Sequence, residues 1–286
     1  MPAIPVQDMI ANVQDLVDDE EANTHSTAEI LSYINSAVGY YDGILAEKAR
    51  KVLTQFRSIS HDGDELEMVM PYLPRIVSVE RTSDSPRTEV YPLDGGFESR
   101  FPFLQLSGGS MPGRYYIQNN QIGIVPQQGS GITTKVWVIL RSPELHYGTL
   151  SASATTSSLI FGTTPTLGTL HKVNDAYNQV PFMLTATREI GVINDYTGST
   201  LTSTLMATLE NNPASAAYSI LPVIDPEYHW LYIWQAVIMG KIRTEENKID
   251  PVSERDRLEA LLEMNIRRYQ SQYGRYVRRH GWGAYA

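Results

Sequence analysis

The chain has 286 residues, a formal net charge of −9 and no cysteine. The negative charge argues against a protein that coats nucleic acid, because neutralising phosphates requires an excess of lysine and arginine on the contacting face. The lack of cysteine excludes disulfides, a thiolate nucleophile and a cysteine-ligated zinc site.

The first part of the chain carries apolar residues at helical spacing. Val6, Met9, Ile10, Val13, Leu16 and Val17 recur at three and four residues, which predicts a short helix that ends near Asp18. Ser26 and Glu29 have the spacing of a capping box, so a second helix is expected to begin there. Its apolar stripe continues to about Ser58, which predicts one long helix.

The middle of the chain changes to alternating or β-rich segments at 67–70, 75–80, 115–125 and 135–140. Asn119 and Asn120 tolerate positive φ, so they predict the tight turn of a hairpin within 115–125. The stretch 142–222 is poor in charge and rich in Ser, Thr and Gly. Its apolar segments at 159–161, 180–184 and 190–193 favour a small β subdomain over a disordered linker.

Two further helices are predicted near the end of the chain. Asp225-Pro226 and Asp250-Pro251 each combine an N-cap residue with proline at the first helical position. The first helix is apolar nearly all round and is expected to be central. The second has an apolar stripe from Leu258 to Tyr276 and a strongly basic end, and the last residues have no helical period.

The expected fold class is therefore α+β, with a helical bundle platform from both chain ends and a large β-rich insertion. The expected segments are N-terminal helices (1–62), a β region (63–149), an inserted Ser/Thr-rich β subdomain (150–222), C-terminal helices (223–278) and a tail (279–286).

No catalytic motif emerges from the sequence. The six histidines are scattered and do not form a zinc-binding H-E-x-x-H pattern, and the glycine-rich stretch 106–113 lacks the Lys and Ser/Thr of a phosphate-binding loop. Asp62, Asp64 and Glu65 lack the spacing of a calcium loop and are better explained as a charged turn. Asp175 and Asp195 could in principle be the two carboxylates of a glycosidase. Their positions in segments rich in turn-forming residues are a simpler explanation for them. We expect no enzymatic activity, cofactor or metal.

No segment of the sequence predicts an attachment to membranes. The first residues lack the basic and apolar regions of a secretory signal, and the most apolar run, 230–239, is too short to cross a bilayer. We therefore expect a soluble protein.

Several segments, taken in order, resemble the head-to-tail adaptor (connector, head-completion) proteins of short-tailed bacteriophages. They are EILSYINSA at 29–37, PRIVSVE at 74–80, YYIQNNQIGIVP at 115–126, VWVILRSP at 136–143 and PEYHWLY at 226–232. Each segment is weak alone, and their order and spacing carry the resemblance. The stretch from about 150 to 221 departs from the compact members of the family.

The resemblance implies a dodecameric ring beneath the phage portal, which joins the portal to the tail tube or nozzle and continues the DNA channel. It places the protein in the virion at the head-tail junction, and in the host cytoplasm during assembly. Duplex DNA is expected to pass through without specific binding, because an acidic channel repels phosphates.

The portal contact is expected at the C-terminus of the chain. Arginines at the end of the last helix attract an acidic partner surface, and two aromatics spaced by small residues are typical of interface anchors. The expected portal-binding residues are Arg267, Arg268, Arg275, Arg278, Arg279, Trp282 and Tyr285.

Two other classes of function remain open at this point. The Ser/Thr-rich β insertion is the one feature that favours a carbohydrate-binding or carbohydrate-cleaving tail component. Aromatic ladders or a carboxylate pair in one groove would support that class. The other class is a monomeric cytosolic binding module.

Overall fold

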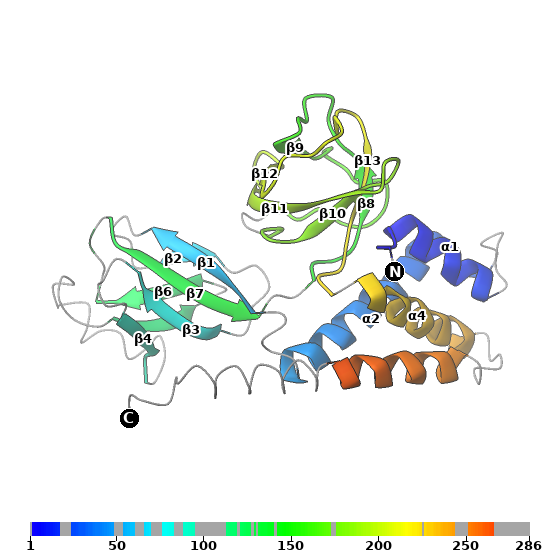
Figure 1. Cartoon of the computed structure of the whole chain (residues 1–286), viewed down its shortest axis with the longest axis horizontal. Helices are drawn as coiled ribbons and strands as arrows, with labels where there is room; N and C mark the ends of the chain where they lie inside the picture. The colour runs from blue at the N-terminus through cyan, green and yellow to red at the C-terminus, as the bar shows by residue number, and fades with distance from the viewer. Residues whose placement is uncertain are drawn as a thin grey trace.

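The structure is a computed structural model with helices at both ends of the chain and two curled β-sheets between them, so the fold is mixed α+β (Figure 1). It describes residues 2–17, 24–48, 54–60, 66–69, 76–82, 88–94, 113–118, 121–126, 129, 131–139, 142–172, 176–224, 226–243 and 251–265. Within these residues, no helix combines the length and the apolar character needed to cross a membrane.

The helices that pack together come from opposite ends of the chain. They are α1 (Val6–Leu16), α2 (Thr27–Lys48) and α4 (His229–Arg243), with the short 3-10 helix η2 (Pro226–Tyr228) before α4 and a further helix at 251–265. Helices α1, α2 and α4 contact one another pairwise. The predicted apolar stripe of α1 is buried except for the partly buried Leu16, and most of α4 is buried too, as expected for a central helix.

The start of α2 agrees with the prediction and its end does not. Ser26 Oγ accepts the backbone N–H of Glu29 at 3.3 Å, as a capping residue does. However, α2 ends at Lys48, and Thr54–Ser60 forms strand β1 rather than the end of a long helix. Strand β1 pairs along its whole length with β7, and this ladder of non-local backbone hydrogen bonds overrides the helical spacing of the sequence.

One sheet has seven strands in the order β1-β7-β3-β4-β5-β6-β2. All its neighbours are antiparallel except β4 and β5, and its two edge strands, β1 and β2, contact each other as the sheet curls. Its strands are β1 (Thr54–Ser60), β2 (Leu66–Val69), β3 (Ile76–Arg81), β4 (Thr88–Pro92), β5 (Arg114–Gln118), β6 (Gln121–Val125) and β7 (Thr133–Ile139). The predicted hairpin is confirmed, since Gln118 pairs with Gln121 across a two-residue connection.

The second sheet has six strands in the antiparallel order β8-β13-β10-β11-β12-β9. Its edges meet: Ser151 N–H donates to the Ile160 carbonyl at 2.8 Å, and Leu150 bridges to Phe161, so we call this sheet the barrel. Its strands are β8 (Tyr147–Thr149), β9 (Ser158–Ile160), β10 (Pro181–Leu184), β11 (Glu189–Thr197), β12 (Thr202–Leu205) and β13 (Ala217–Ile220). The stretch that was expected to form a β subdomain contains strands β9 to β13.

The strand pairing moves two of the expected segment boundaries. Strand β1 lies inside the segment 1–62, which was expected to be helical, but it belongs to the seven-stranded sheet. Strand β8 lies before residue 150, but it pairs with β13 in the barrel. Asp195, which turn chemistry was expected to explain, lies instead within β11, and the turn follows Thr197. For β1 and β8 the pairing partner is distant in sequence, so local composition does not reveal it.

The barrel is joined to α2 by side chains that bind the connecting backbone. Asn35 accepts the N–H of Leu145 at 2.8 Å and donates to its carbonyl at 3.3 Å. Further along α2, the buried carboxylate of Asp42 accepts the N–H of Ser142 at 2.5 Å. The Ser142 hydroxyl oxygen in turn accepts the N–H of Val223 at 3.0 Å. The chain therefore enters and leaves the barrel at points tied to Asp42.

The barrel interior is aromatic and contains one strongly buried histidine. His146 makes edge contacts with Tyr177 and Tyr218, and its Nδ1 lies 3.2 Å from the carbonyl oxygen of Glu144. Burial lowers the pKa of His146 to about 4; the backbone bond to Glu144 partly opposes this shift. The ring is therefore neutral in the folded protein at neutral pH.

Acidification is expected to destabilise the fold through His146. An unfolded histidine has a pKa near 6.5, so below that pH the unfolded chain binds a proton that the folded chain does not. The stability that is fully present above pH 6.5 is lost as the pH falls toward 4, by about 2 kcal/mol between pH 7.5 and 5.0. Urea unfolding at both pH values measures this loss. His146→Phe should reduce the difference between the two pH values, and an equal difference in that variant would contradict the assignment.

Gly168 illustrates how tightly the barrel packs near His146. It has φ +90°, and a Cβ at this position would lie 2.6 Å from the Cβ of His146 and 3.1 Å from the carbonyl oxygen of Leu145. Gly168→Ala is expected to cost about 2 kcal/mol, from backbone strain together with overpacking. Gly131 is a matched control, since it has φ +83° with no atom within 4 Å, so Gly131→Ala should cost only about 1 kcal/mol. Thermal unfolding measures both losses of stability. If Gly168→Ala costs no more than Gly131→Ala, the atoms around Gly168 have moved to make room for the added methyl group.

Candidate binding cleft

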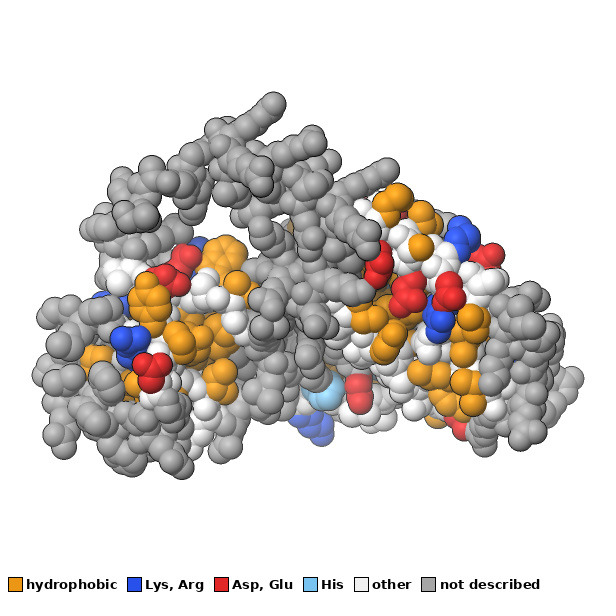
Figure 2. Space-filling view, turned by 90° about the horizontal axis from the view of Figure 1, so that it is seen from below, with side chains coloured by type: hydrophobic (Ala, Val, Ile, Leu, Met, Phe, Trp, Pro, Cys, Tyr) orange, Lys and Arg blue, Asp and Glu red, His pale blue; other side chains and the backbone are white. Residues whose placement is uncertain are grey.

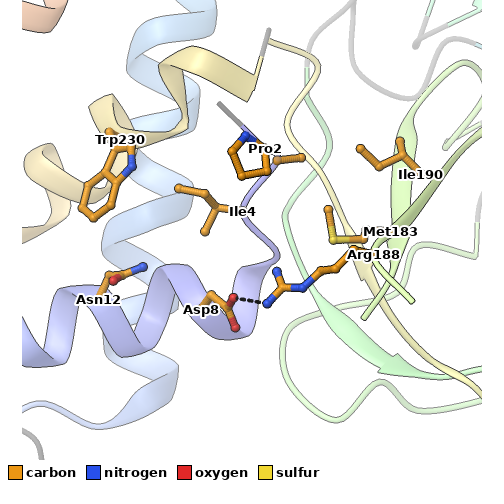
Figure 3. Close-up of a pocket in the computed structure, with 9 residues that line it drawn as sticks. Pro2, Ile4, Asp8, Asn12, Met183, Arg188, Ile190 and Trp230 are labelled. Carbon is orange, nitrogen blue, oxygen red and sulfur yellow. Dashed lines mark hydrogen bonds and ion pairs between the residues drawn. The ribbon is translucent and has the colours of Figure 1, made fainter. Parts of the chain in front are cut away.

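A cleft of about 540 Å³ lies where the N-terminal segment, α1, the β10–β11 hairpin and the start of α4 meet (Figure 3). Its volume is in the range of small-ligand and side-chain sites. It is lined by Pro2, Ala3, Ile4, Asp8, Asn12, Met183, Arg188, Ile190 and Trp230. The lining is thus mostly apolar, with one acid, one base and one amide.

The N-terminal segment forms one wall because both the barrel and α4 hold it. Ala3 packs in a small buried cluster with Met183 and Leu221 of the barrel. The N–H of Ile4 donates to Nδ1 of His229 at 3.2 Å, and the N–H of Val6 donates to the Ser219 hydroxyl at 2.8 Å. These contacts fix the wall in an extended conformation before α1 begins.

An ion pair crosses the lip of the cleft. Arg188 Nη2 lies 2.8 Å from Asp8 Oδ2, and both side chains are about half exposed, at 53% and 42%. An exposed pair of this kind contributes between about 0 and 1 kcal/mol to stability. Figure 3 shows the pair joining the hairpin to α1.

Arg188 is held in an unusual backbone conformation. It is the last residue of the turn between β10 and β11, with φ 58°, and its N–H donates to the Leu184 carbonyl at 2.8 Å. Left-handed φ costs a residue other than glycine about 1 kcal/mol or more. Glycine or asparagine would be less strained at this position. The presence of an arginine is therefore better explained by the contacts of its side chain at the lip of the cleft.

The composition of the cleft resembles that of a protein-binding surface. Trp230 forms one side and stacks at a tilt on Trp234, with ring centroids 6.1 Å apart. Partly exposed Trp and Arg beside aliphatic side chains are the composition of protein-binding hot spots. Among the described lining residues, Asp8 is the one acid, and none is a His, Ser, Thr or Lys that would act as nucleophile or base.

The expected portal-binding residues lie outside the described residues, which end at 265: Arg267, Arg268, Arg275, Arg278, Arg279, Trp282 and Tyr285. Asp62, Asp64, Glu65 and Asp175 also lie outside them, and Asp195 is exposed on β11. Over the part of the chain that is described, no three His, Asp or Glu side chains are grouped as metal ligands would be.

No protein-family model matches this chain, and no curated protein sequence matches it either.

Proposed function

We propose that this chain is a structural subunit of a phage head-to-tail adaptor. Its copies would form a ring, most simply a dodecamer, that binds the portal on one side and the tail tube or nozzle on the other. The observation that carries the proposal is the ordered series of sequence segments from 29–37 to 226–232, which resembles that family. Resemblance in sequence and architecture is associational, so the function needs its own test.

The arrangement of the helices supports a platform role. Helices α1 and α2 from the start of the chain and α4 and 251–265 from its end contribute to one buried cluster. We propose that these helices form a helical bundle platform on the portal side and that the β-sheets face the tail. A rigid helical layer suits a part that must transmit load between two rings.

The charge of the chain supports passage of DNA rather than binding. With a net charge of −9, a ring of these subunits repels phosphates along much of its surface, so duplex DNA would slide without specific contacts. The proposed location is the head-tail junction of the virion, with assembly in the host cytoplasm and no membrane partner. No enzymatic activity, cofactor or metal forms part of the proposal.

The carbohydrate alternative gains no support from the barrel. Four of its aromatic rings, which would stack on sugars if they were exposed, are buried instead: Phe161, Tyr177, Tyr196 and Tyr218. The rings contact one another at edge angles, as in a packed core. Asp195 is exposed on β11, and the cleft has Asp8 as its one described acid.

Electron microscopy of particles assembled without this protein tests the proposal. An adaptor connects head and tail, so we expect DNA-packaged heads without tails in such preparations. Supplying the protein afterwards should restore tailed particles. Normal tails on particles that lack the protein would rule out the adaptor function.

A further inference from the structure

The helix at 251–265 is apolar on two sides. Leu258 and Leu262 are buried at 7% and 5% exposure and join the main core. On another side of the same helix, Leu261 and Met264 are 39% and 41% exposed, and Ala260 lies beside them. We call Ala260, Leu261 and Met264 the apolar knob. Figure 2 views the molecule from the side on which the helix 251–265 lies, and hydrophobic side chains lie there among acidic and basic ones.

The knob and the cleft lie on different sides of the subunit. The cleft is between the barrel and the first turns of α1 and α4, whereas the helix 251–265 lies across α4 from the barrel (Figure 1). One subunit thus carries a protruding apolar site and a recessed apolar site that do not face each other. Two such sites on one chain join copies head to tail, in a ring if the rotation closes.

The charges beside the two sites are complementary. Arg257, one turn before Leu261, pairs with Glu254 at 2.8 Å, and both side chains are exposed, at 61% and 43%. The cleft carries the exposed pair Asp8–Arg188. Each pair contributes little within its own subunit, so the four charges can re-pair between subunits at small cost. Arg257 would then face Asp8, and Glu254 would face Arg188.

We propose that Leu261 and Met264 of one copy insert into the cleft of a second copy, beside Ile190 and Trp230. The burial of Leu261, Met264 and Trp230 supplies the affinity, and the two charge pairs fix the orientation. The proposed contact gives the guanidinium of Arg188 a role at a position where glycine or asparagine would be less strained. The inference rests on the proposed adaptor ring and assigns its contact between neighbouring subunits.

Disulfide trapping between two single-cysteine variants tests the contact, because the natural chain has no cysteine. Ile190→Cys copies mixed with Leu261→Cys copies should cross-link into heterodimers under mild oxidation. Met206→Cys, in place of Ile190→Cys, is a matched control, since Met206 is 54% exposed and lies on the barrel outside the cleft. We expect about tenfold less cross-linking for that control. A chain with both Ile190→Cys and Leu261→Cys should give a ladder beyond dimers, because the contact is head to tail.

Charge reversal tests the pairing independently. Adding Arg257→Glu to the Leu261→Cys copy should lower the yield of its cross-link to the Ile190→Cys copy about tenfold, because it places a second acid opposite Asp8. Asp8→Lys in the Ile190→Cys copy should restore the yield, because the knob is then flanked by two acids and the cleft by two bases. Loss without restoration would contradict the proposed pairing.

Three results of the cross-linking experiment would overturn the inference. They are equal cross-linking by Met206→Cys, Leu261→Cys homodimers as the main product, and no cross-link between the Ile190→Cys and Leu261→Cys copies with or without portal rings. The proposed function can be separated from this contact. Rings that form normally on a portal with Leu261→Glu would overturn the contact and leave the adaptor function standing. Cross-linked copies that never bind a portal would support the contact and reject the function.

Discussion

A chain that lacks residues 281–286 is expected to fold as the full chain does and to fail to attach to a portal ring. Trp282 and Tyr285 are spaced by glycine and alanine, and such aromatics anchor interfaces. Loss of one aromatic anchor costs an interface about 2 kcal/mol or more, which is about 30-fold in affinity. Trp282→Ala should therefore reproduce much of the loss. Co-sedimentation with portal rings measures attachment, and thermal unfolding measures folding.

The salt dependence of attachment to the portal shows whether the aromatic residues of the tail or the arginines that precede it carry the contact. If Arg267, Arg268, Arg275, Arg278 and Arg279 carry the contact, attachment of the full chain should weaken strongly with added salt, because exposed charges are screened. If the aromatics carry it, the salt effect should be small and the truncation effect large. Unchanged attachment by the truncated chain would show that the tail is not the anchor.

Asp42→Ala is expected to lower the free energy of unfolding by about 3 kcal/mol. The substitution removes a buried carboxylate that accepts the N–H of Ser142 and lies 3.3 Å from its hydroxyl. It leaves that part-buried N–H without its charged acceptor and loosens the link to Val223. Because this link ties both connections of the barrel to α2, protection from hydrogen exchange should fall at 142–146 and 221–224 together.

Two variants distinguish the Asp42 hydrogen bonds from its charge and from general surface effects. Asp42→Asn keeps one acceptor oxygen, so it should cost about half as much as Asp42→Ala. Asp256→Ala removes an exposed acid, 56% accessible, and should change stability by less than about 0.5 kcal/mol. A loss for Asp42→Ala no larger than that for Asp256→Ala would show that the link to the barrel does not hold the fold.

Much of the local structure follows from the sequence because the signals are local. The stripe of α1, the Ser26 cap and the hairpin through Gln118 and Gln121 depend on residues a few positions apart. The end of α2 could not be predicted in the same way, since Thr54–Ser60 is a strand only because β7 pairs with it about 80 residues later. The pairing of strand β8 with the barrel could not be predicted for the same reason, as its partner β13 lies about 70 residues away.

The cleft could not be predicted from the sequence at all. Its walls come from the N-terminal segment, the β10–β11 hairpin and α4, three parts of the chain that only the fold brings together. The single local signal is Arg188 at the end of a hairpin turn, where glycine or asparagine is usual, and an arginine is ordinary in any solvated turn. The barrel closure through Leu150 and Phe161 likewise depends on contacts between strand edges.

The adaptor function is tested most directly by the mass of this protein, alone and after mixing with a purified portal ring, measured by native mass spectrometry. An adaptor should add a full ring of subunits to the portal, with a mass increase that matches one copy for each portal subunit, and partial occupancies should be rare if neighbouring copies contact each other. A portal whose mass does not change in the presence of excess protein would contradict the function proposed here.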